Sequence, residues 1–163
     1  MSAMQPAPGA LAGALGTLAV SAWEPARDAL LGHPPVYAVR SLATLGARRA
    51  WGVRLSPRSA LRWGLLARWL YGPAMGTLYA ALRPRLPASV RLGGLTLGAA
   101  VALLEHVAFP LLRVTPPWRT WSLGEKALLD LQVMLFGVVT EAVLSRRTPP
   151  HDAKPRRVGV AGI

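Results

Sequence analysis

Four long apolar segments divide the chain, and each is close to the length that an α-helix needs to cross a lipid bilayer. They cover about residues 8–31, 59–82, 92–112 and 123–144. A helix of about 20 mainly apolar residues spans the hydrocarbon core. Prolines lie between the segments, where they interrupt helix formation. The pattern predicts an all-α integral membrane protein, in which residues 1–147 form one bundle of four transmembrane helices.

Two of these helices have recognisable starts. Ser56-Pro57 is typical of a helix N-terminus, and Ser122 with Glu125 three residues later forms a capping box. The basic first connection, residues 32–58, has apolar residues spaced loosely enough for a helix lying among lipid headgroups. An ordinary solvated loop with one helical turn fits this connection equally well, so both interpretations stay open.

Composition supports the membrane assignment. The chain is 52% apolar and only 16% charged, whereas soluble domains are about one quarter charged. Its net charge is +12. Most arginines lie between the apolar segments, where they would contact lipid headgroups rather than nucleic acid. Positive charge is too evenly divided between the two sides to set the orientation. The polar, proline-rich residues 148–163 are expected to be a disordered tail.

Small residues recur on one face of each apolar segment. Residues three, four or seven apart share a helix face. The glycines expected to pack helices together on these faces are Gly9, Gly13, Gly72, Gly76, Gly94, Gly98 and Gly137. Small residues let membrane helices approach closely, and ionisable residues avoid lipid. Because both kinds of residue share these faces, we expect the faces to point into the bundle.

Five ionisable residues on or beside these faces fall at a similar depth in an antiparallel bundle. They are Glu24, Arg68, Glu105, His106 and Asp130. A structural interpretation is that Arg68 bridges Glu105 and Asp130 and so fixes the helix register. A functional interpretation is that the cluster lines a cavity for a proton, an ion or a small polar solute. In that case Glu105 and His106 would exchange protons, and Arg68 would supply the counter-charge.

A second polar site is possible at Glu141, which lies near the opposite surface beside Arg146 and Arg147. Other chemistry has little support. The chain has no cysteine, and the adjacent Glu105 and His106 point about 100° apart on a helix, so no metal site is predicted. No nucleophile lies in a recognisable catalytic motif. We therefore expect no cofactor and no enzymatic activity.

The C-terminal third resembles a known family. The residues concerned are His106 to Leu111 (HVAFPL), Thr115-Pro116-Pro117, Glu125, and a last helix running from Glu141 to Arg146-Arg147. With these residues, the stretch 94–147 is similar to the YagU type of bacterial inner-membrane protein, a family to which no biochemical activity is assigned. The resemblance implies a bacterial inner membrane with both termini in the cytoplasm. It implies no substrate.

Two functional hypotheses follow. The first is an inner-membrane protein that moves or senses protons or a small polar solute through the Glu/Arg/His/Asp cluster. The alternative is a non-transporting accessory or scaffold subunit that docks partners through its small-residue helix faces. Membrane lipids are the expected partners in both cases, together with a second copy of the chain or another membrane protein.

Overall fold

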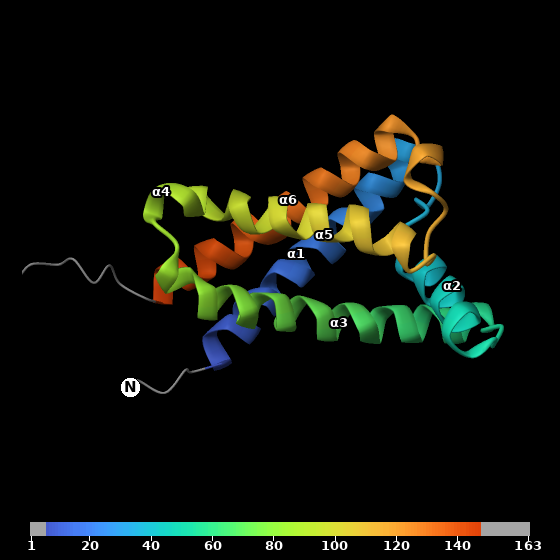
Figure 1. Cartoon of the computed structure of the whole chain (residues 1–163), viewed down its shortest axis with the longest axis horizontal. Helices are drawn as coiled ribbons and strands as arrows, with labels where there is room; N and C mark the ends of the chain where they lie inside the picture. Colours follow the sequence, from blue (N-terminus) through green and yellow to red (C-terminus); the bar gives the residue numbers. More distant parts are fainter. Residues whose placement is uncertain (1–5, 148–163) are drawn as a thin grey trace, which may run out of the picture.

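The computed structural model describes residues 6–147, and all regular structure within that range is helical (Figure 1). The longer helices are α1 (Pro6–Leu31), α2 (Val39–Trp51), α3 (Pro57–Leu82), α5 (Leu95–Leu111) and α6 (Leu123–Arg147). The short elements are η1 (Arg83–Arg85), α4 (Ala88–Arg91), η2 (Leu92–Gly94) and η3 (Trp118–Thr120). The all-α prediction is confirmed for this part of the chain. The predicted tail, residues 148–163, lies outside the described residues.

Side-chain caps start α3 and α6 where the sequence places them. The Ser56 hydroxyl accepts a hydrogen bond from the Ser59 N–H at 3.2 Å. At α6, the Glu125 N–H donates to the Ser122 hydroxyl at 3.1 Å, and the Ser122 N–H donates to the Glu125 carboxylate at 2.9 Å. This reciprocal pair is the predicted capping box. Glu125 also accepts from the Val36 N–H at 3.1 Å, which ties the connection after α1 to the start of α6.

The first connection contains a true helix, α2, rather than only a solvated loop. Gly52 ends it in the left-handed conformation, with φ of 67°, and its N–H returns to the Arg48 carbonyl. α2 packs on α3. A Cβ atom on Gly64 of α3 would lie 2.3 Å from the Val39 carbonyl oxygen, so this glycine sets how closely α2 approaches.

Helix packing in the bundle is uneven. α1 lies against both α3 and α6, and α5 lies against α6. α3 and α5, in contrast, do not pack closely along their lengths, and Figure 1 shows them as separate layers with α1 and α6 crossing behind. α1 begins and α6 ends at the end of the bundle opposite α2 (Figure 1). The arrangement leaves the α3 and α5 faces apart from each other in the middle of the molecule.

Glycines bring the packed helices into backbone contact. A Cβ atom on Gly13 of α1 would lie 2.2 Å from the Gly72 carbonyl oxygen of α3, and one on Gly94 would lie 2.2 Å from the Gly137 carbonyl oxygen of α6. Such separations are far shorter than any real Cβ contact, so only glycine fits. All seven glycines named as packing residues meet another helix in this way: Gly9 and Gly13 against Gly72 and Gly76, and Gly94 and Gly98 against α6, including Gly137.

The outside of the bundle is strongly apolar. Exposed large hydrophobic side chains outnumber the buried hydrophobic residues of the described chain, and they occur on all four long helices. Two stretches are long and apolar enough to cross a membrane by length and composition, Leu92–Leu111 and Leu123–Arg147. α1 and α3 are longer, at 26 residues each, but are less apolar or more charged than these two stretches. Length and composition therefore support two of the four predicted membrane spans directly.

Candidate functional site

A network of ion pairs and hydrogen bonds joins α1, α3 and α6 in the interior. Arg68 of α3 donates from both terminal nitrogens to the two oxygens of Glu24 on α1, with Nη2 and Oε1 2.8 Å apart. A planar guanidinium and a carboxylate make their strongest pair in this two-bond geometry. Glu24 and Arg68 were both expected in the polar cluster, and the structure brings them together.

Arg27 lies at the centre of this network, although it was not among the predicted site residues. It is 1% exposed. Its Nη1 donates to the Gln132 amide oxygen of α6 at 2.6 Å, its Nη2 to Asp28 at 2.7 Å, and the same nitrogen reaches Glu24 at 3.3 Å. The guanidinium also lies 5.5 Å from the centre of the Tyr37 ring. Arg27 therefore links α1 to α6 as Arg68 links α1 to α3.

Tyr37 closes the network from the connection before α2. Its hydroxyl donates to the Glu125 carbonyl oxygen at 3.0 Å, and its ring stacks at a tilt on Trp121, with ring centres 5.6 Å apart. Burial raises the pKa of the Tyr37 hydroxyl well above its ordinary value, while the charge of Arg27 opposes that shift. Tyr37 consequently acts as a neutral hydrogen-bond donor at any physiological pH.

Glu105 of α5 lies across from Arg68, without a direct ion pair to it. It is 8% exposed, and the Tyr71 side chain of α3 lies beside its carboxylate. Arg68 attracts Glu105 electrostatically, but both terminal nitrogens of Arg68 are directed to Glu24. Glu105 is therefore a buried carboxylate that lies near the Tyr71 phenol and forms no ion pair within residues 6–147.

His106 and Asp130 form a separate pair. His106 Nε2 and Asp130 Oδ1 are 3.8 Å apart, and the Asp130 side chain is half exposed. The His106 ring contacts Trp118 and Trp121, and its Nδ1 lies 2.8 Å from the Ala102 carbonyl oxygen. The predicted bridge from Arg68 to Asp130 is not formed. Leu129 and Gln132 occupy the buried face of α6, which turns Asp130 to the flank.

Glu141 has a different partner from the arginines that follow it in sequence. Arg83, just beyond α3, donates to both of its oxygens, with Nη2 and Oε1 2.9 Å apart, and this hydrogen bond raises the pKa of Arg83. The Tyr79 hydroxyl donates to Glu141 at 2.8 Å, and the Ser145 hydroxyl at 2.7 Å. Glu141 is buried, so the second polar site exists as an α3–α6 clamp at the end opposite α2.

A cavity of about 690 Å³ opens in the space between α3 and α5. One face of α2 covers it, with Val39, Leu42 and Ala43 among the lining residues. Its wall is mainly apolar, and the charged side chains that reach it are Arg68 and Glu105. His106 and Asp130 are absent from the lining. The predicted cluster therefore divides into a cavity side, with Glu24 behind Arg68, and an outer His106–Asp130 pair.

No family model, curated protein or solved structure matches this chain. The resemblance to the YagU type therefore gains no support from these comparisons.

Several polar residues of the site were not predicted from the sequence, among them Arg27, Asp28, Tyr37 and Gln132. Arg27 follows Glu24 by three positions, so the two share a helix face, and that spacing was a usable signal. Nothing in the sequence pairs Gln132 with α1, because the contact depends on how α6 is rotated. Within the described residues, no group of three or more His, Asp and Glu side chains is placed to hold a metal ion.

Proposed function

We propose that the protein is an integral membrane protein whose four long helices all cross the bilayer, and that it binds a small solute in the cavity beside Glu105 and Arg68, for transport or sensing. The observation that carries this proposal is the inverted polarity of the bundle. Arg27, Glu105 and Glu141 are buried, while large apolar side chains face outward on every long helix. A water-soluble protein would show the opposite distribution, whereas lipid favours this one.

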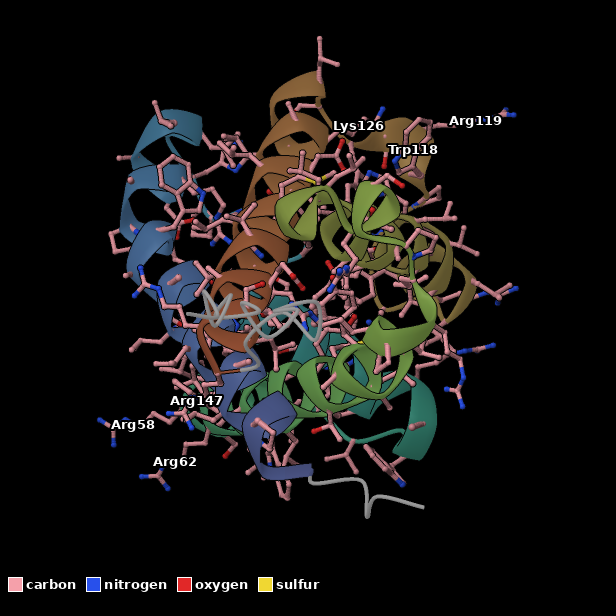
Figure 2. The ribbon with its side chains drawn as sticks, turned by 90° about the vertical axis from the view of Figure 1, so that its left-hand side faces the viewer. Arg58, Arg62, Trp118, Arg119, Lys126 and Arg147 are labelled. Carbon is pink, nitrogen blue, oxygen red and sulfur yellow. The ribbon has the colours of Figure 1, made fainter. Side chains whose placement is uncertain are left out.

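Charges also lie where headgroups would be. Arg58, Arg62 and Arg119 extend away from the bundle (Figure 2), and all three are exposed. Lys126 lies 4.1 Å from the centre of the Trp118 ring, an aromatic–cation contact typical of a membrane interface. α2 shows the same division, with apolar residues toward the cavity and exposed Arg40, Arg48 and Arg49 elsewhere. These features support a bundle whose apolar middle lies in hydrocarbon.

The scaffold alternative has weaker support. It requires small-residue faces that remain free to dock a partner. The seven packing glycines instead lie in contacts between helices of the same chain. A solute-binding role requires a cavity that reaches the ionisable groups, and the cavity between α3 and α5 meets that requirement.

The absence of cysteine makes the membrane topology directly testable. Single cysteines at Leu18, Leu70, Leu103 and Leu131 place one thiol on the exposed surface of each long helix; Leu103, for example, is 68% exposed. In native membranes we expect all four to resist a water-soluble maleimide, because lipid covers them, while Arg49→Cys reacts. If only the α5 and α6 thiols are protected, the bundle crosses the membrane twice. If all four react as fast as Arg49→Cys, the membrane assignment is wrong.

Access to the cavity can be measured with two neighbouring residues of α5. Val101 and Ala102 are both buried, but only Val101 lines the cavity. We expect Val101→Cys to react with a small methanethiosulfonate reagent at least about tenfold faster than Ala102→Cys, because only a solute-accessible space admits the reagent. Equal, slow rates at the two positions would mean that the cavity does not admit solutes, and would remove the solute-binding proposal.

A further inference from the structure

The wall of the cavity is rich in aromatic rings. Both phenylalanines of the chain line it, together with two tyrosines and two tryptophans. These residues are Tyr37, Trp51, Trp63, Tyr71, Phe109 and Phe136. The face of an aromatic ring carries partial negative charge and attracts cations, most strongly where water is excluded. The lining is therefore suited to an apolar molecule with positive charge.

The charges around the cavity point to the same ligand class. The network contains three carboxylates, Glu24, Asp28 and Glu105, and two guanidiniums, Arg27 and Arg68. Arg27 is committed to Glu24, Asp28 and Gln132, and Arg68 binds both oxygens of Glu24. With all groups ionised, the network carries one excess negative charge, and the carboxylate that has no ion pair within residues 6–147 is Glu105, on the cavity wall.

An anion would meet a less favourable site. Among the described residues, Arg68 is the one basic residue in the lining, and its terminal nitrogens already donate to Glu24. His106 is next to Glu105 in sequence but lies against Asp130 and the two tryptophans outside the cavity. The basic group of the described helices that acts on Glu105 is thus Arg68, which already binds Glu24.

We infer that the cavity binds a lipophilic cation, such as an amine or onium ion with a bulky apolar body. Its positive centre lies against Glu105 and its apolar part lies among the aromatic rings. This inference rests on the proposed function, because it requires that solutes enter the cavity. α3 and α5, which line the cavity from two sides, also carry exposed large apolar side chains, which suits a ligand that partitions into lipid.

Tetraphenylphosphonium and tetraphenylborate test the ligand class, because they have the same shape and opposite charge. Binding to the purified full chain in detergent can be followed by tryptophan fluorescence, since Trp51 and Trp63 line the cavity. We expect the phosphonium ion to bind at least about tenfold more tightly than the borate ion, the size of effect expected for a buried charge pair. Glu105→Gln should weaken phosphonium binding by at least about tenfold.

The matched control is Asp130→Asn, which removes a carboxylate from a neighbouring helix outside the cavity. The affinity of this variant for the phosphonium ion should stay within about twofold of that of the unaltered protein, because residue 130 does not contact the bound ion. Tighter binding of borate, or a Glu105→Gln variant that binds phosphonium normally, would overturn the inference about charge while leaving a solute cavity in place. If neither ion binds and Val101→Cys is unreactive, the proposed function itself fails.

A second measurement covers the case in which Glu105→Gln does not fold. Val101→Cys, with Glu105 intact, can be treated with cationic and anionic methanethiosulfonate reagents of similar size. Each rate is divided by that of the same reagent with a free thiol in solution. We expect the cationic reagent to be faster, because Glu105 follows Val101 by one helical turn and both residues line the cavity. A faster anionic reagent would contradict the inference.

Discussion

Replacing Arg27 with methionine is expected to lower the free energy of unfolding by about 3–5 kcal/mol, as found when one member of a buried ion pair is removed. Methionine retains an apolar stem of similar length but makes none of the hydrogen bonds to Asp28, Gln132 and Glu24. The arginine is 1% exposed, so water cannot replace these bonds. Unfolding can be measured in mixed micelles with increasing denaturing detergent.

The control for Arg27→Met is Arg40→Met, which removes an exposed arginine outside the ion pairs of residues 6–147. It should change stability by less than about 0.5 kcal/mol. Adding Gln132→Leu to Arg27→Met should recover part of the loss, because the double variant no longer leaves the Gln132 amide buried without its donor. If Arg27→Met is no worse than Arg40→Met, the network does not hold α1 to α6.

Adding one methyl group at Gly13 is the second change with a large expected effect. In Gly13→Ala the new Cβ would lie 2.2 Å from the Gly72 carbonyl oxygen and 3.0 Å from the Gly76 Cα. These neighbours are backbone atoms, which cannot rotate away, so α1 and α3 must separate. We expect a loss of about 1–3 kcal/mol or more, the range for overpacked interiors. Thermal unfolding of the purified protein measures it.

Gly46→Ala is the matched control, because it makes the same chemical change inside a helix with space available. Its Cβ would lie 3.7 Å from the nearest atom, a methyl group of Val114. Alanine favours helix over glycine by about 0.5–1 kcal/mol, so this variant should be as stable as the unaltered protein or more stable. A Gly13→Ala protein with the same unfolding temperature as Gly46→Ala would show that α1 and α3 are not in backbone contact.

The positions of the long helices could be predicted from sequence because the signals that set them are local. Residues 123–144 were expected as a helix and α6 covers Leu123–Arg147, beginning at the Ser122–Glu125 capping box. Residues 59–82 correspond to α3, Pro57–Leu82, which begins after the Ser56 cap. In each case a continuous apolar run forms the helix, and a serine whose side-chain oxygen accepts a backbone hydrogen bond marks where it begins.

Side-chain partners were harder to predict, because they depend on which helices are neighbours. Depth along the helices predicted one common level for Arg68, Glu105 and Asp130, but it did not determine the direction in which each side chain points. Asp130 and Gln132 differ by two positions, so they lie on opposite sides of α6. Packing of Leu129 and Phe136 turns Gln132 inward to Arg27 and leaves Asp130 at the flank beside His106.

The sequence by itself determined a helical chain with an apolar surplus, its long helices, their caps, and glycines at spacings that allow close contact. Those properties follow from residues near one another along the chain. Long-range packing places α1 between α3 and α6, keeps α3 and α5 apart beside a cavity, and leaves Glu105 on its wall with no ion pair from residues 6–147. Packing between distant segments sets these features, because the close contacts at glycines and the rotation of each helix decide which side chains meet a buried charge.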